Sequence, residues 1–152
     1  MHVRSNLAPL LAAFSGYLGT HEFVEVERKI NKWNEEAFFH SSTIDLRIAT
    51  ARGDVSIEAR PSDSNEEWYD VQTVLEMVTG AVPRLLDAQS ATFVVAEMES
   101  AHHKVAAFFT CERSDRTSKY ALWVEGSYWG SVLRTRAARE ALRTSKRWWR
   151  FW

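Results

Sequence analysis

The chain of 152 residues has a single cysteine, Cys111. One cysteine cannot form an intrachain disulfide, so the sequence shows no adaptation to an oxidising compartment, and we expect a cytoplasmic protein. The charges of the neighbouring Glu112 and Arg113 offset each other, and no histidine is close in sequence to activate the thiol. We therefore expect Cys111 to be buried and structural rather than a nucleophile.

Long apolar runs are also missing, since no stretch approaches the roughly 20 apolar residues that cross a membrane. The stretch from Leu7 to Leu18 follows one positive charge, as in a signal peptide. However, Pro9 and several small or polar residues interrupt it, and its apolar residues fall at helical spacing. We interpret residues 6–18 as a helix with Asn6 at its N-cap.

Sequence patterns of enzymes are absent as well. The chain has no Gly-rich phosphate loop, no His-Glu-x-x-His, no Gly-x-Ser-x-Gly and no paired cysteines for zinc. The adjacent pair His102-His103 would place its two rings on opposite faces of an extended chain, so we interpret it as a turn between strands and not as a metal site. We predict a non-enzymatic protein with no metal and no cofactor. An enzyme with no recognisable motif is the alternative.

The clearest pattern that is present lies in the middle of the chain. Bulky apolar residues occupy alternate positions from Ile44 to Thr50 and again from Val55 to Ala59, which is the period of a half-buried strand. The connector includes Gly53, which can adopt the positive φ of a tight turn. We predict an antiparallel hairpin with strands near 44–51 and 55–60.

A helix is predicted next, near residues 66–79. Ser64 followed three residues later by Glu67 has the pattern of a capping box, and Trp68 opens an apolar stripe of helical spacing. Gly80 stands where a left-handed C-cap is expected. Four carboxylates gather at this helix start, where they interact favourably with the helix dipole. These residues are Asp63, Glu66, Glu67 and Asp70.

The rest of the chain completes an α+β pattern in one domain, residues 1–152. Two further helices are predicted near 22–39 and 131–147, with residues 23–26 left open as the start of a strand, and three further strands near 92–99, 104–111 and 120–125. We predict an antiparallel sheet of about five strands, in two hairpin units, packed against three to four helices. Trp33 and Trp123 are expected on apolar faces. The predicted core contains Leu46, Ile48, Val55, Ile57, Trp68, Leu75, Val95 and Phe109.

Overall charge is balanced, with 19 basic and 20 acidic residues, but its distribution is not. Residues 131–152, termed here the basic C-terminal segment, hold seven basic residues and one acidic residue, a net charge of +6. Residues 1–130 hold 12 basic and 19 acidic residues, a net charge of −7. Arg139, Arg143 and Arg147 lie four apart on one predicted helix face, where like charges repel by roughly 0.2–0.5 kcal/mol per pair. A role other than helix stability is therefore expected for them.

The basic C-terminal segment is the predicted binding region. Its candidate partner-binding residues are Arg139, Arg143, Lys146, Arg147, Trp148, Trp149, Arg150 and Trp152. The interpretation we prefer is that the end of this segment docks on the acidic remainder of the same chain. A second is that it binds a separate acidic protein. A third is that it contacts nucleic acid or an anionic membrane, because basic residues mixed with aromatics suit phosphate contact, base stacking and interfacial anchoring.

These features together predict a small soluble protein-binding module. A motif-poor α+β domain with an acidic body suits stoichiometric binding of another protein, such as neutralisation (immunity-like) or chaperoning, although this is an argument by type and not by motif. The alternative is a nucleic-acid-binding or anionic-membrane-binding protein that acts through residues 131–152.

Overall fold

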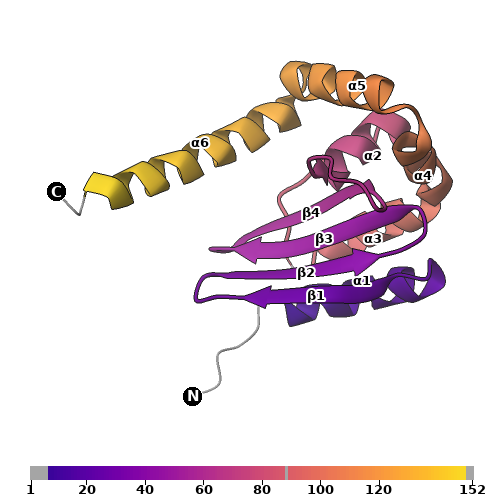
Figure 1. The fold of residues 1–152 in the computed structure, drawn as a ribbon, viewed down its shortest axis with the longest axis horizontal. Helices are drawn as coiled ribbons and strands as arrows, with labels where there is room; N and C mark the ends of the chain where they lie inside the picture. The colour runs from indigo at the N-terminus through magenta and orange to yellow at the C-terminus, as the bar shows by residue number, and fades with distance from the viewer. Residues whose placement is uncertain (1–6, 88, 150–152) are drawn as a thin grey trace.

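The structure is a computed structural model that describes the backbone of residues 7–87 and 89–149, and the side chains of these residues as far as 138. A helix is followed by four strands in a meander, a two-residue fifth strand and five further helices (Figure 1). These elements are α1 (Ala8–Thr20), β1 (Val24–Ile30), β2 (Asn34–His40), β3 (Ile44–Ala51), β4 (Asp54–Pro61), β5 (Tyr69–Asp70), α2 (Val71–Thr79), α3 (Ala91–Ser100), α4 (His102–Thr110), α5 (Arg113–Gly126) and α6 (Tyr128–Trp149).

The five strands form one antiparallel sheet in the order β1-β2-β3-β4-β5. The α+β class and the five-stranded antiparallel sheet are therefore confirmed. The described residues form six helices and not three to four, and the sheet is one continuous meander in place of two hairpin units.

The predicted central hairpin is confirmed as β3 and β4. Ile48 lies opposite Ile57, and the strands are joined by a two-residue turn in which Arg52 and Gly53 both have positive φ, 50° and 87°. Two successive left-handed residues give the turn whose twist matches that of the flanking strands. The four core residues predicted on this hairpin, Leu46, Ile48, Val55 and Ile57, are buried.

The helix predicted near 22–39 is wrong, because this stretch forms β1 and β2. Burial alternates along β2, where Ala37 and Phe39 face the core, while every residue of β1 is exposed at the sheet edge. The turn between them depends on Asn31, whose Oδ1 accepts hydrogen bonds from the backbone N–H of Trp33 and Asn34. Asparagine commonly supports turns in this way, and this residue was the overlooked signal.

The three strands predicted near 92–99, 104–111 and 120–125 are also wrong, because they form α3, α4 and α5. In α3 and α4 the apolar residues recur at helical spacing as well as in runs, and the helical face is the one the fold buries: Ala91, Val94, Met98, Ala101 and Val105. In α5 only Arg116 is buried. Valine and phenylalanine favour strands in general, but tertiary packing overrides such preferences.

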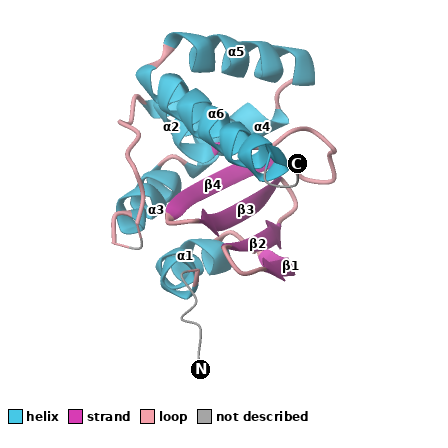
Figure 2. Cartoon of the chain, turned by 90° about the vertical axis from the view of Figure 1, so that its left-hand side faces the viewer, coloured by secondary structure: helices cyan, strands magenta, loops and turns pink. Residues whose placement is uncertain are grey.

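Helices α1 to α4 form one layer over the sheet. Figure 2 shows α1, α2 and α3 on the same side of the strands, and α4 contacts both α2 and β4. Side chains from both layers fill the core, among them Phe14, Leu75 and Phe109 from the helices and Ile48 and Ile57 from the strands. On the other face of the sheet, Arg47 forms ion pairs with Glu36 and Glu58. The helix-covered face is therefore the core, and polar contacts order the other face.

The segment before α2 differs from its prediction. The helix begins at Val71 and not near residue 66, and its N-cap is Asp70, which accepts hydrogen bonds from the backbone N–H (2.9 Å) and hydroxyl (2.8 Å) of Thr73. Gly80 has the expected left-handed φ of 76°. Trp68 consequently lies in a loop, half-buried against Phe38, in place of the core.

The N-terminal helix is confirmed as α1, with Pro9 in its first turn. Its predicted N-cap, Asn6, lies outside the described residues. Val95, predicted in the core, is only partly buried and packs against it.

Candidate functional site

The last two helices meet the rest of the molecule at a surface built from three carboxylates. Of the 14 residues in α5, only Arg116 is buried, so apolar packing contributes little to holding this helix. Its polar contacts are made instead to Glu66 in the loop before β5, to the backbone N–H of Asp70 at the N-cap of α2, and to Glu76 on α2. The carboxylate of Asp70 contacts α6, through Trp129. The candidate site is the region around these three acidic residues.

Glu66 and Arg116 form the most enclosed contact of this surface. Their exposed fractions are 6% and 4%, and Nη2 of Arg116 donates to both carboxylate oxygens of Glu66, at 2.9 and 2.7 Å. The Tyr69 hydroxyl donates a further hydrogen bond to Oε1 of Glu66 at 3.1 Å, and Nη1 of Arg116 donates to the carbonyl of Cys111 at 2.5 Å. A planar guanidinium matches a carboxylate in this geometry.

Asp70 joins β5, α2, α5 and α6. Its Oδ2 accepts a hydrogen bond from Nε1 of Trp129 at 2.7 Å, and its own N–H donates to the Tyr120 hydroxyl oxygen at 2.9 Å. Burial raises the pKa of Asp70 above its usual range, and the hydrogen bonds from Trp129 and Thr73 oppose the shift. Burial also raises the pKa of Tyr120, to about 12. The hydroxyl of Tyr120 is therefore neutral at physiological pH.

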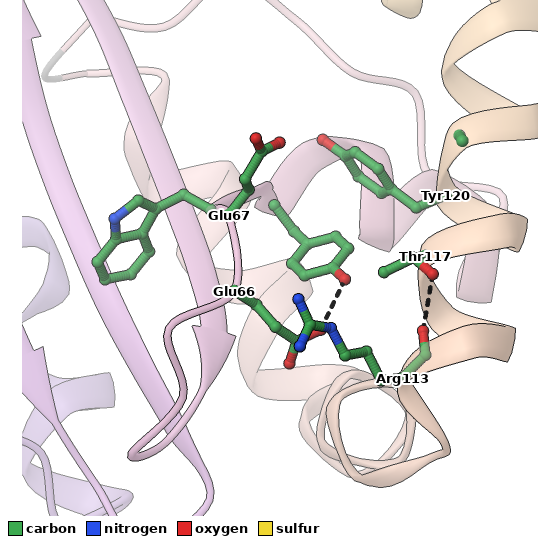
Figure 3. Close-up of a pocket in the computed structure, with 8 residues that line it drawn as sticks. Glu66, Glu67, Arg113, Thr117 and Tyr120 are labelled. Carbon is green, nitrogen blue, oxygen red and sulfur yellow. Dashed lines mark hydrogen bonds and ion pairs between the residues drawn. The ribbon is translucent and has the colours of Figure 1, made fainter.

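Two cavities share Trp68 and Tyr120 in their linings. The loop cavity, of about 340 Å³, is shown in Figure 3 and is lined by Glu66, Glu67, Trp68, Tyr69, Arg113, Thr117, Tyr120 and Ala121. The strand cavity, of about 280 Å³, is lined by Ser56, Glu58, Trp68, Asp70, Tyr120, Leu133 and Arg136. Glu58 and Asp70 are register partners on β4 and β5, so two carboxylates converge on the strand cavity. Burial is also the largest cause that raises the pKa of Glu58, against the opposing effect of Arg47.

A third depression lies where α5 turns into α6. The junction groove, of about 590 Å³, is lined by Glu76, Gly80, Leu122, Trp123, Gly126, Ser127 and Tyr128. Three of these side chains are large, apolar and exposed: Leu122 (71%), Trp123 (38%) and Tyr128 (85%). Nε1 of Trp123 donates to Oε1 of Glu76 at 2.5 Å, which fixes one wall of the groove. This concentration of exposed apolar area is typical of an interaction surface.

The predicted C-terminal helix is confirmed as α6, which begins at Tyr128 and leads away from the sheet (Figure 1). Six of the candidate partner-binding residues lie on this helix: Arg139, Arg143, Lys146, Arg147, Trp148 and Trp149. Their side-chain contacts, and the residues Arg150 and Trp152, lie outside the described part of the structure. Docking of this end on the body therefore stays a prediction. Arg134, Ala137 and Ala138, which precede these candidate residues on α6, have exposed side chains.

Several smaller predictions need correction. Cys111 is exposed, at the C-cap of α4, because its run forms a helix and not a buried strand. Trp33 and Trp123 are exposed rather than buried. His102 and His103 begin α4 instead of forming a turn between strands; the His102 ring stacks on His21, with 3.7 Å between ring centroids.

Of the four acidic residues predicted at one helix start, only Asp70 caps that helix. Glu66 instead pairs with Arg116, 50 positions later in the chain. The sequence held no signal for this contact, because nothing at either position indicates the other.

In the part of the chain that the structure describes, no three His, Cys, Asp or Glu side chains gather as a metal site would need. No described helix is both long and apolar enough to cross a membrane. Comparison with known protein families, with curated proteins and with solved structures gives no match to this chain.

Proposed function

We propose that this protein is a non-enzymatic protein-binding module, and that its partner presents an acidic, amphipathic segment to the junction groove and the basic C-terminal segment. The observation that carries the proposal is the junction groove itself, where Leu122, Trp123 and Tyr128 expose large apolar side chains around one depression. Exposing such area to water is unfavourable, and partner binding would bury it.

Charge supports the acidic character of the partner. Tyr128 lines the groove and is the first residue of α6, the helix that holds most of the basic C-terminal segment, whose net charge is +6. A helix with apolar residues on one face and acidic residues beside them would satisfy both parts, which is a common mode of helix recognition. Neutralising or chaperoning a partner protein would both use such a surface.

Affinity capture from the native cell, repeated with variants, tests this proposal. The variant Leu122→Ser/Tyr128→Ser removes apolar area from the junction groove, and the matched control Val82→Ser/Leu85→Ser removes similarly exposed apolar area elsewhere. We expect one stoichiometric protein to be captured by the wild type and the control but not by the groove variant. Capture that is equal for all three, or recovery of nucleic acid in place of protein, would contradict the proposal.

One observation favours a second candidate function, acid–base catalysis. Glu58 and Asp70 face the same strand cavity, and burial raises the pKa of both, which is a pattern found at active sites. Both carboxylates already have partners, Arg47 for Glu58 and Trp129 for Asp70. Screening the protein against hydrolase substrates tests this candidate, because any activity found should be lost in Asp70→Asn and kept in Leu122→Ser.

A further inference from the structure

The loop cavity contains two charged side chains that the fold leaves without a strong partner. Among the side chains that the structure describes, in residues 7–87 and 89–138, Glu67 has neither a hydrogen bond nor an ion pair. Arg113 is 68% exposed, and its nearest carboxylate oxygen, Oε1 of Glu66, lies 3.9 Å from its Nε. That oxygen already accepts hydrogen bonds from Arg116 and Tyr69. The guanidinium of Arg113 forms only this long ion pair with Glu66, and its remaining N–H groups can bind another anion.

The remaining charges of the cavity cancel. Of the three charged lining residues, Glu66 is neutralised by Arg116, which lies behind the lining as its buried partner, so Glu67 and Arg113 are the charges that a ligand would meet. They come from different elements, Glu67 from the loop before β5 and Arg113 from the first turn of α5 (Figure 3). The cavity thus offers one carboxylate and one guanidinium from separate sides.

The rest of the lining is largely aromatic. Trp68, Tyr69 and Tyr120 form walls of the cavity, and the edge of Tyr69 packs against Tyr120 with 4.8 Å between ring centroids. A volume of about 340 Å³ is near the lower limit of small-molecule sites, which restricts the ligand to a molecule of roughly amino-acid size. Aromatic rings bind either an apolar side chain or a cation.

We infer that the loop cavity binds a small zwitterion, namely a free α-amino acid with an apolar side chain. Its ammonium group pairs with Glu67, its carboxylate accepts hydrogen bonds from Arg113, and its side chain lies against Trp68 and Tyr120. A ligand with one charge would leave either Glu67 or Arg113 without a counter-charge. The exposure of both groups keeps the expected affinity in the millimolar range, because surface ion pairs contribute little each.

This inference goes beyond the proposed protein partner and does not depend on it. The junction groove and the loop cavity share no lining residue, so each can bind its ligand without the other. Titration with a small ligand needs no partner protein, so the two proposals can fail independently.

Nuclear magnetic resonance titration of the full chain with L-phenylalanine tests the inference. The matched probes are L-phenylalanine methyl ester, which lacks the carboxylate, and N-acetyl-L-phenylalanine, which lacks the ammonium group. We expect saturable shifts at residues that line the loop cavity, with affinity for each single-charge probe weaker by about tenfold. Absence of saturable shifts, shifts confined to other surfaces, or equal affinity for either single-charge probe would overturn the inference.

Single substitutions assign the two charges. Glu67→Gln should abolish the preference for phenylalanine over its N-acetyl derivative, and Arg113→Gln should abolish the preference over its methyl ester. Lys119→Gln removes an exposed charge of α5 that does not line the cavity, so it should keep both preferences. Preferences that survive in Glu67→Gln and Arg113→Gln would contradict the assignment. If either variant fails to fold, the comparison of the three probes on the wild type decides alone.

Discussion

The ion pair between Arg116 of α5 and Glu66 is almost completely buried. Such a pair is weak evidence for stability, because removing two charges from water costs about as much as their attraction returns, but removing only one partner leaves a buried charge uncompensated. The role of this pair is therefore to fix where α5 sits. A substitution at either position should affect the whole helix.

Arg116→Met should lower the free energy of unfolding by about 2–4 kcal/mol, somewhat less than for a fully enclosed pair because the loop cavity adjoins Glu66. The double variant Glu66→Gln/Arg116→Met should lose less than the single variant, since no unpaired charge stays buried and the amide can still accept from Tyr69. Urea unfolding measures both. A double variant less stable than Arg116→Met would contradict this account.

His102 should make stability depend on pH. Its ring stacks on His21, and its Nδ1 lies 2.9 Å from the Tyr17 hydroxyl. Burial lowers the pKa of His102, and His21 and His103 lower it further, against the opposing effect of Glu99. Because the folded state binds a proton at this ring less readily than the unfolded state, stability is present above about pH 6.5 and is lost as pH falls through the lower folded pKa.

Urea unfolding at pH 8 and pH 5 measures this effect, with the His102→Phe variant as the comparison. The variant keeps an aromatic ring against His21 but cannot be protonated, so its stability should fall less between the two pH values. An equal fall in both proteins would assign the pH dependence to other groups.

At the scale of elements, the joint between α5 and α6 depends on one glycine. A Cβ placed on Gly130 would lie 1.8 Å from the backbone oxygen of Val124, much closer than any real contact. Ser127 caps the start of α6 here, because its hydroxyl accepts a hydrogen bond from the N–H of Gly130. The close approach sets the direction in which α6 leaves α5.

Gly130→Ala should therefore destabilise the joint by about 1–3 kcal/mol, as overpacking does, since backbone must move to admit the methyl group. The matched control is Gly16→Ala in the middle of α1, where an added Cβ meets no atom within 4 Å. That substitution should stabilise the protein by roughly 0.5–1 kcal/mol, through the better helix propensity of alanine. Thermal unfolding compares the two, and equal effects of the same sign would contradict the prediction.

Elements whose pattern has a single interpretation were predictable. The hairpin of β3 and β4 alternates cleanly, and its turn requires Gly53, so both its position and its register follow from local sequence. By contrast, β1 is exposed throughout and has no core-facing alternation to detect. Ala91, Val94 and Met98 fit a helix face, yet their neighbours also fit a strand, and only packing on the sheet decides between the two. The candidate site was least predictable, because Glu66 and Arg116 meet through tertiary structure alone.

The separation of charge along the chain predicts different roles for the acidic residues 1–130 and for the basic C-terminal segment. A chain ending at Ala138 keeps every described contact of α5 and the start of α6 with the body, including those of Arg116, Trp129 and Arg136. If the C-terminal end binds the acidic partner, as proposed, the melting temperature should stay close to that of the wild type while affinity for this partner falls. A large drop in melting temperature would instead favour docking of the C-terminal end on its own body.

Salt provides the complementary measurement. Partner affinity of the wild type should weaken as ionic strength rises, because exposed charges are screened beyond about 8–10 Å at physiological salt, and the chain ending at Ala138 should lose most of this dependence. Binding of RNA or DNA that falls log-linearly with salt would favour the nucleic-acid alternative. Calorimetric titration at two or three salt concentrations separates these outcomes.

Because α5 has little apolar packing, it should unfold locally more easily than the rest of the molecule. The meander and α1–α4 share a continuous core, whereas α5 is held chiefly by polar side chains that reach across about 50 positions of sequence. Such a unit can detach while the rest stays intact, with a free energy below that of global unfolding. Amide hydrogens of residues 113–138 should accordingly exchange with solvent sooner than those of β3, and partner binding at the junction groove should slow that exchange.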